Sequence, residues 1–339
     1  RSLARLSRRA ARAAGGRNGV PCRGGRGATV SALPLRRPHE VACVALAFAL
    51  LLLPLRGGRA AVPRLQAGVV VDVGPGAQLT RLAAAADDLY IIDAAPGHVR
   101  RYILHGLPYA ELMTQVMRWK EGADKLIMGK PLDLYLSGER LLILDSLGSL
   151  WSYWGPDYSR TFVPLRLQSN QGAIVALARH GGDLLVLDPD TRQIWVYHSD
   201  ASGGYDTTPR PLMPRPIADL RDATRLAVSH DALYVLLVRG AVLALPWRHP
   251  RTIVRLGLAG EATGVWASAA HGGCLVSFAR SIVFVDQGGM VRWRASLRGL
   301  GDDTIRDIAL SPSGRLYLLT QTRIWLVQSP PPAVVTAFT

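Results

Sequence analysis

The feature that most constrains this chain is a short apolar pattern that recurs along most of its length. Its clearest copy is Leu184–His198, LLVLDPDTRQIWVYH, in which two apolar runs flank a turn rich in Asp and Pro. β-Branched and aromatic residues on both sides of such a turn predict a β-hairpin. A chain that repeats one hairpin is expected to place similar sheets next to one another. Weaker copies begin at Leu89, Leu141, Leu233, Cys274 and Leu316.

The spacing of the hairpins gives the size of the repeating unit. Aligned at the end of their second predicted strand, the copies lie 40 to 52 residues apart. A period of about 40–50 residues is typical of a β-propeller, in which each repeat forms one four-stranded blade. The aligned positions are Asp93, Asp145, Asp188, Val238, Phe278 and Thr320.

A run of small and apolar residues precedes each hairpin and predicts the strand nearest the axis, where close packing requires such residues. The segment Tyr109–Gly129 is open to two interpretations, an outer strand or an amphipathic helix. The predicted inner strands are 81–85, 133–137, 174–178, 225–229, 264–268 and 307–311.

These repeats resemble the six-bladed β-propellers of the NHL and TolB-like kind. The shared pattern is an inner strand ending in Ser or Ala, a run such as Leu89–Asp93 (LYIID), a short turn, and a strand such as Ile194–Tyr197 (IWVY). The similarity covers Val69–Thr339. It implies an all-β fold, a six-bladed β-propeller over residues 67–339, and it says nothing about activity.

A propeller ring closes when a strand from one end of the chain joins the last blade to the first. Two segments are candidates for this strand, Val69–Val73 and Ala333–Phe338. Closure also hides sheet edges that otherwise pair with other chains. The sequence leaves the choice between the two segments open.

The N-terminal region differs from the repeats in composition. Residues 1–40 are rich in Arg, Gly and Ala without periodicity and predict a disordered basic tail. Residues 41–56 contain an uncharged apolar run and predict one short hydrophobic N-terminal helix, acting as a signal peptide or membrane anchor. Residues 57–66 form a predicted linker. We therefore expect an extracytoplasmic domain, secreted or anchored through this segment.

Charge and cysteine content restrict the partners. The formal charge of +15 lies mostly in the N-terminal arginines, which leaves residues 65–339 with about +3. A domain so close to neutral has no strong field for phosphates, so nucleic acid is not an expected partner. Cys274 is the one cysteine of the repeat region, which excludes an internal disulfide or a Cys-x-x-Cys metal pair there. We expect a monomeric propeller without cofactor or metal.

Four charged residues share one register at the start of predicted inner strands: Arg81, Asp133, Arg225 and Asp307. Their signs differ, and all four are expected to face the axis. One interpretation is mutual ion pairing that seals the channel, because paired charges are how burial is tolerated. The other is a polar ligand pocket on the axis.

Arginines in the hairpin turns form a second candidate binding site. If the hairpins share one rim, their guanidinium groups suit anionic ligands such as sugar acids. The alternative is solvated surface charge, which is common for Arg. These residues are Arg100, Arg192, Arg239, Arg280 and Arg323.

Two smaller sets carry weaker hypotheses. Aspartates at the end of the second strand could form a carboxylate arc, or could accept hydrogen bonds from turn amides. Histidines between the first and second strands of neighbouring repeats could ligate a metal, or could be turn residues too far apart to share an ion. The aspartates are Asp93, Asp145 and Asp188, and the histidines are His180, His230 and His271.

The sequence contains no Gly-x-Ser-x-Gly, His-Glu-x-x-His or P-loop signature. We therefore expect a non-catalytic binding or scaffold propeller that presents one face to a protein or an anionic glycan. One alternative is a propeller enzyme of the lyase, lactonase or dehydrogenase kind that uses the axial pocket. Another is the sensor domain of a membrane signalling system.

Overall fold

The computed structural model describes residues 62–104, 112–117, 128–138, 140–154, 159–163, 171–200, 204–206, 208–248, 252–268 and 270–328. The contacts divide the chain into two units, 1–60 and 61–339, and the described residues belong to the second. The predicted basic tail, the hydrophobic helix and the candidate closing segment Ala333–Phe338 lie outside them. Within the described part, no helix is long and apolar enough to span a membrane.

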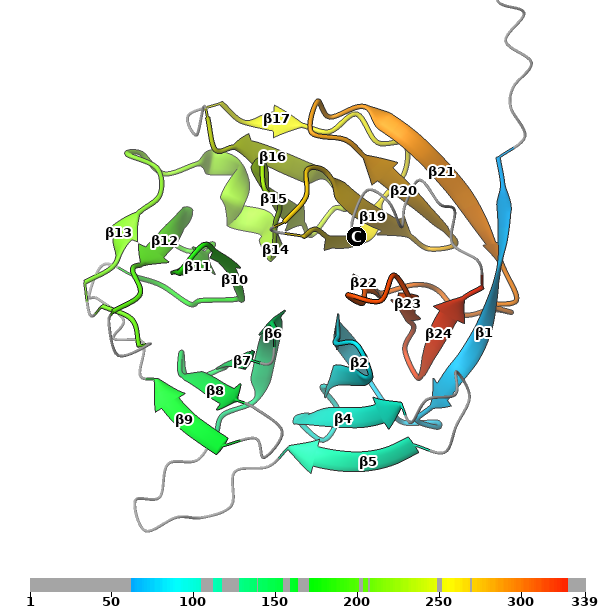
Figure 1. Cartoon of the computed structure of the whole chain (residues 1–339). Coiled ribbons are helices and arrows are strands. Elements are labelled where there is room, and N and C mark those ends of the chain that lie inside the picture. The colour runs from blue at the N-terminus through cyan, green and yellow to red at the C-terminus, as the bar shows by residue number, and fades with distance from the viewer. Residues whose placement is uncertain are drawn as a thin grey trace, which may run out of the picture. The chain divides into compact units, whose positions relative to one another are not determined.

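The described residues form an all-β fold in which antiparallel sheets stand around a common axis (Figure 1). The strands nearest the axis are β2 (Leu79–Ala84), β6 (Pro131–Ser137), β10 (Ala176–His180), β14 (Ala223–Val228), β18 (Ala262–Trp266) and β22 (Asp307–Leu310). The strands that follow them are β3 (Asp88–Asp93), β7 (Arg140–Asp145), β11 (Asp183–Asp188), β15 (Ala232–Leu237), β19 (Cys274–Phe278) and β23 (Leu316–Leu319).

The third strands are β4 (His98–Leu104), β8 (Leu150–Trp154), β12 (Gln193–Tyr197), β16 (Val242–Pro246), β20 (Ser281–Val285) and β24 (Arg323–Val327). The outermost strands are β5 (Leu112–Met117), β9 (Ser159–Val163), β13 (Arg210–Pro211), β17 (Val254–Arg255), β21 (Val291–Arg298) and β1 (Arg64–Asp72). A 3₁₀ helix, η1 (Ala218–Asp222), precedes β14.

Four of the sheets among the described residues contain four strands in chain order, β2–β5, β6–β9, β10–β13 and β14–β17. A further sheet contains eight strands in the order β18-β19-β20-β21-β1-β24-β23-β22. Strand β5 answers the open question about Tyr109–Gly129, because it pairs with β4 as an outer strand. The inner strand predicted at 174–178 begins two residues later. Ala176, and not residue 174, is the first residue of β10 that pairs with β11, opposite Leu187.

The N-terminal strand β1 closes the ring. It pairs antiparallel with β24, from Ala67 opposite Val327 to Asp72 opposite Arg323. Its first residues pair parallel with β21, where Arg64 lies opposite Ser296. The candidate closing segment Val69–Val73 is thereby confirmed, and the strand begins a few residues before the predicted propeller boundary at 67.

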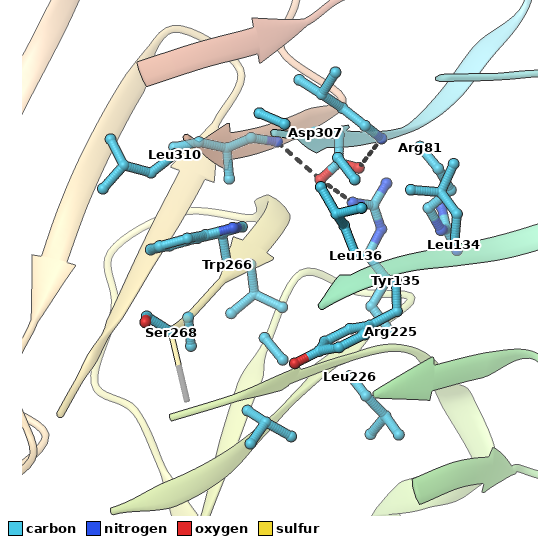
Figure 2. A pocket seen from close by; sticks show the side chains of 18 of the residues that line it. Arg81, Leu134, Tyr135, Leu136, Arg225, Leu226, Trp266, Ser268, Asp307 and Leu310 are labelled. Atoms are coloured by element: carbon cyan, nitrogen blue, oxygen red, sulfur yellow. Dashed lines mark hydrogen bonds and ion pairs between the residues drawn. The ribbon is translucent and has the colours of Figure 1, made fainter. Parts of the chain in front are cut away.

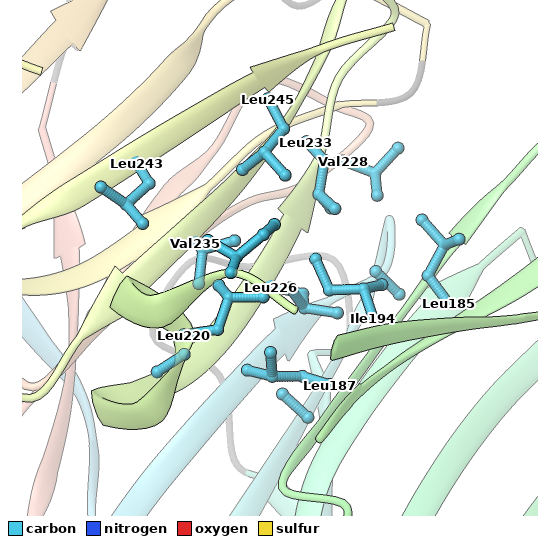
Figure 3. Close-up of a cluster of buried hydrophobic side chains, with 14 of the residues drawn as sticks. Leu185, Leu187, Ile194, Leu220, Leu226, Val228, Leu233, Val235, Leu243 and Leu245 are labelled. Carbon is cyan, nitrogen blue, oxygen red and sulfur yellow. The ribbon is translucent and has the colours of Figure 1, made fainter. Parts of the chain in front are cut away.

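Side chains from neighbouring sheets fill the space between them. In β11, Leu185 and Leu187 pack toward β14–β17, whereas Leu184 and Val186 pack toward β6–β9. This explains the uninterrupted apolar run of the hairpin, because successive side chains of a strand point to opposite faces and here both faces are covered. Figure 3 shows the first of these clusters, which Leu220 of η1 completes.

We predict that deletion of residues 66–73 destabilises the domain strongly. It removes the strand that covers β24 and the buried side chains of Ala67 and Val71. The expected loss of unfolding free energy exceeds about 4 kcal/mol, because the core and a full ladder of hydrogen bonds go together. Thermal unfolding of the truncated chain is the measurement. A chain lacking only residues 1–60 is the control, and an unchanged midpoint in the 66–73 deletion would refute the closing role of β1.

Candidate functional site

The two ends of the ring axis are distinct, and we name them by the direction of the inner strands. Face A is the end at which these strands begin, and it also carries the turns between second and third strands. Face B is the end at which the inner strands finish. The assignment follows from the antiparallel order of each sheet together with the meeting of Arg81, Asp133, Arg225 and Asp307 at one level of the axis.

Arg81 links three inner strands near face A. Its Nε donates to Asp133 Oδ1 at 3.0 Å, its Nη1 donates to the Thr80 carbonyl at 3.1 Å, and its Nη2 donates to the Thr224 carbonyl at 3.2 Å. The second carboxylate oxygen of Asp133 accepts the Leu177 amide at 2.9 Å. Inner strands β2, β6, β10 and β14 are therefore tied together by one ion pair and its hydrogen bonds.

Arg225 makes the corresponding contacts on the other side of the axis. It pairs with Asp307 and donates to the carbonyls of Thr80, at 2.8 Å, and Arg306, at 3.1 Å. Asp307 Oδ2 accepts the Leu82 amide at 2.9 Å. We call the four side chains Arg81, Asp133, Arg225 and Asp307, with these backbone partners, the axial network.

Burial dominates the electrostatics of the axial network. Desolvation raises the pKa of Asp133, and the positive charge of Arg81 opposes this shift. Desolvation also lowers the pKa of Arg225, and the neighbouring Arg81 lowers it further. Ion pairs and hydrogen bonds, rather than water, are the contacts that oppose these shifts. The predicted pairing of the four residues is confirmed, whereas their binding of a ligand stays a prediction.

Two inner strands, β10 and β18, carry small residues at the positions that correspond to the four charged side chains, which leaves space for the axial network. Ala176 of β10 and Gly264 of β18 pair with their second strands at the places that correspond to Arg81 in β2. A Cβ on Gly264 would lie 2.7 Å from Ser277 Oγ and 3.1 Å from the Asp307 Cα. A side chain at Gly264 therefore conflicts with the packing of the inner strands around Asp307.

A cavity of about 430 Å³ runs along the axis between the inner strands, and the axial network forms its floor (Figure 2). Its lining combines polar and apolar groups, and Leu134, Leu226 and Leu310 are among the apolar residues of its walls. The exposed lining residues are Gly138, Ala270 and Pro312, which all lie in turns at face B. The cavity thus reaches the surface at face B, and the axial network lies at its other end.

The hairpin arginines differ in whether their guanidinium groups form ion pairs or hydrogen bonds within the protein. Arg100 Nη2 lies 2.9 Å from Asp93 Oδ2, and Arg323 Nε lies 2.8 Å from Asp72 Oδ2. Arg280 donates to the Gly301 carbonyl.

Arg192 and Arg239 are exposed, and neither guanidinium has an ion pair within the described residues. Both lie in turns between second and third strands, at face A. Arg192 has the left-handed backbone conformation, with a φ of 56°.

The aspartates that end second strands are buried turn residues. Asp145 accepts the amides of Gly129, Leu147 and Ser149 at 2.8–2.9 Å and the Trp151 indole at 2.8 Å. Asp188 is held in the same way, and its indole donor is Trp195 at 3.1 Å. These contacts confirm the turn interpretation, since each oxygen of these two carboxylates already accepts hydrogen bonds.

The three candidate histidines lie near face B without forming a metal site. The His180 ring stacks on Trp247, with ring centroids 4.2 Å apart, and burial lowers the pKa of His180. The His230 amide donates to the His271 carbonyl at 2.8 Å. Across the described residues, no group of three or more His, Cys, Asp or Glu side chains is placed to hold a metal ion.

Sequence reasoning missed the two aromatic residues of the cavity, Tyr135 and Trp266. It also missed the aspartate–indole bonds, although the sequence carries their signal. A tryptophan follows the aspartate by six residues in Asp145–Trp151 and by seven in Asp188–Trp195. The hydrogen bonds from the axial arginines to backbone carbonyls leave no signal in the sequence.

No family model matches the sequence, and no curated protein matches it either. Among solved structures, the chain is similar to a streptogramin B lyase structure, with a TM-score of 0.52 and 9% identity over 77% of this chain and 97% of that one. It is also similar to a catalytically inactive virginiamycin B lyase from Staphylococcus aureus with quinupristin, with a TM-score of 0.50 and 9% identity over 77% and 98% of the two chains. A further match is the WD40 β-propeller domain of Doa1, with a TM-score of 0.49 and 9% identity over 80% and 99% of the two chains.

At such identities the likeness shows the fold alone. Together with the sheets around one axis, it defines the chain as an all-β protein with a β-propeller fold.

We predict that Arg225→Met destabilises the protein by roughly 3–5 kcal/mol, because it leaves the Asp307 carboxylate buried without its cation. Urea denaturation is the measurement. The matched control is Arg292→Met, which removes a largely exposed arginine from its pair with Asp286 and is expected to cost at most about 1 kcal/mol. Equal losses of unfolding free energy in the two variants would show that the axial network stabilises the protein no more than a surface ion pair does. The double variant Arg225→Met/Asp307→Leu should recover part of the lost stability.

Proposed function

We propose that this chain is an exported, non-catalytic β-propeller that binds a protein or an anionic glycan through face A. The observation that carries the proposal is the pair of exposed arginines Arg192 and Arg239, in the turns β11–β12 and β15–β16 of neighbouring sheets. A guanidinium without an ion pair keeps its donors for a carboxylate or sulfate, which it binds in a planar, bidentate way.

The buried charged side chains contact other groups of the protein, and this supports a binding role over catalysis. Asp145 and Asp188 are occupied by turn amides and indoles, and the axial arginines and aspartates are occupied by one another. A general acid or base must reach a substrate proton, and each oxygen of these four carboxylates already accepts a hydrogen bond from the protein.

We further propose that the ring has six blades of the NHL-like kind. The eight-stranded sheet supports this count, because it consists of two antiparallel halves that meet at the parallel pairing of β1 with β21. Each half then corresponds to one blade, and β1 supplies the outer strand of the last one.

The alternative function is a propeller enzyme of the lyase, lactonase or dehydrogenase kind. The axial cavity favours it, since an enzyme of this fold requires an enclosed site. Apart from the axial network, His271 and Tyr135 are the titratable side chains among the described residues that line the cavity. They are the groups that such a reaction would have to use.

We predict that Arg192→Ala/Arg239→Ala weakens binding of heparin, used as a model anionic glycan, by roughly tenfold, because two charge-assisted contacts are lost. Isothermal titration calorimetry at physiological salt is the measurement. The matched control, Arg210→Ala/Arg255→Ala, removes the same charge from the exposed outer strands β13 and β17. Equal weakening in both double variants would mean that heparin senses only net charge, and it would refute face A as the site.

We predict that a fusion of residues 1–66 to alkaline phosphatase gives active enzyme in a bacterial host, because the phosphatase needs the disulfides that form outside the cytoplasm. Phosphatase activity in whole cells is the measurement. The control fusion carries Leu51→Arg and Leu52→Arg, which interrupt the apolar run and should abolish activity. An inactive fusion with the native sequence would contradict export.

A further inference from the structure

The axial cavity is separate from the arginines of face A, because it opens at face B. Its volume of about 430 Å³ lies within the range of small-molecule pockets. The exposed turns at face B give a ligand a way in. The chemistry of the floor, walls and mouth therefore decides what the cavity accepts.

The floor offers no spare charge. All three nitrogens of the Arg81 guanidinium donate to oxygens of the protein, Arg225 Nη1 pairs with Asp307, and Arg225 Nη2 donates to two carbonyls. Two arginines and two aspartates also cancel in net charge. An ionic ligand would lose its hydration on entering without gaining a counter-ion, which is costly in a cavity of this depth. The floor therefore selects uncharged ligands.

The walls favour a flat apolar body. Figure 2 shows Tyr135 and Trp266 at the cavity together with Leu136 and Leu310. Both rings are only half-buried, so part of each aromatic surface faces the open space. An aromatic or otherwise planar ligand gains by packing against such rings, beyond the apolar area that it buries.

The mouth supplies polar contacts. Ser268 lies at the rim, and its Oγ accepts the Ala270 amide at 3.3 Å, so its hydroxyl hydrogen remains for a ligand oxygen. The hydroxyl of Tyr135 donates to the Arg179 carbonyl at 3.4 Å, and its oxygen can accept a further hydrogen bond. A few placed polar groups above apolar walls are the usual means of orienting a small ligand.

We infer that the axial cavity is a binding site for an uncharged, planar small molecule that carries a hydroxyl or carbonyl group, entering from face B. This site is independent of the glycan or protein site proposed on face A. The tight, neutral floor distinguishes it from a site for sugar acids, phosphates or amines.

Three probes of one shape and different charge test this inference on the full chain. They are 2-naphthol, 2-naphthoate and 2-naphthylmethylammonium, which at neutral pH are uncharged, anionic and cationic. Saturation-transfer difference NMR and calorimetry should detect binding of the naphthol, with affinities about tenfold or more lower for both ions. Absence of naphthol binding, or equal affinity for the three probes, would overturn the inference.

Two variants locate the site. Ala267→Leu narrows the cavity from the end of β18 and Ala83→Leu narrows it from β2, and both residues are half-buried lining residues. Each should lower naphthol affinity by about tenfold or more, as added methylenes do in a fitted pocket. The control is Ala95→Leu, in the exposed turn between β3 and β4 at face A, which should leave binding unchanged. Thermal unfolding identifies a variant that fails to fold, and naphthol binding is then judged from the other cavity variant.

Unchanged naphthol binding in a folded cavity variant would place the probe elsewhere and overturn the inference. Heparin binding is measured in parallel on the same proteins. It should be unaffected by Ala267→Leu, because the arginines of face A do not line the cavity. Failure at the axial cavity and failure at face A are thus distinguished in one set of experiments.

Discussion

The structure depends on a small group of opposite charges that meet where the inner strands converge. Sheets arranged around an axis leave space at the centre, and the inner edge of each sheet carries backbone N–H and C=O groups that no neighbouring strand pairs. Apolar side chains could fill this space but could not form hydrogen bonds with those groups. Arg81 and Arg225 instead reach across the axis to backbone carbonyls of other strands, while Asp133 and Asp307 accept amides. A buried ion pair is weak evidence of stability by itself. Here it also fixes the relative level of strands that share no ladder of hydrogen bonds.

The same network lies between the two proposed sites. It lies toward face A, where Arg192 and Arg239 stand in exposed turns, and the axial cavity reaches exposed turns at face B. The two proposed sites therefore differ in chemistry for a structural reason. In these proposals the paired charges of the floor disfavour charged ligands in the cavity, and the exposed guanidinium groups of Arg192 and Arg239 favour anionic ones.

Much of this could be read from the residues in order. The recurring hairpin predicted sheets of one type, and the shared register of Arg81, Asp133, Arg225 and Asp307 predicted their meeting, because both are properties of strand periodicity. The position of Ala176 was missed, since a two-residue shift keeps every side chain on its expected face. The sequence predicted the hairpin arginines as one candidate site but could not show which of them are paired. Arg323, for example, meets Asp72, which lies about 250 residues earlier in the chain. Which rings line the cavity depends on the packing of several sheets at once.

The pairing of β1 has a consequence for the order in which the chain can reach its final state. Strand β1 leaves the ribosome long before its partners β21 and β24, because most of the propeller lies between them in the sequence. Contacts that span most of a sequence pay a large loop-closure entropy before they contribute, which slows folding. Until the C-terminal strands arrive, β1 has an unpaired edge, and that edge is a site for mistaken association with other chains. Closure of the ring thus requires that β1 stays unpaired until β21 and β24 are made.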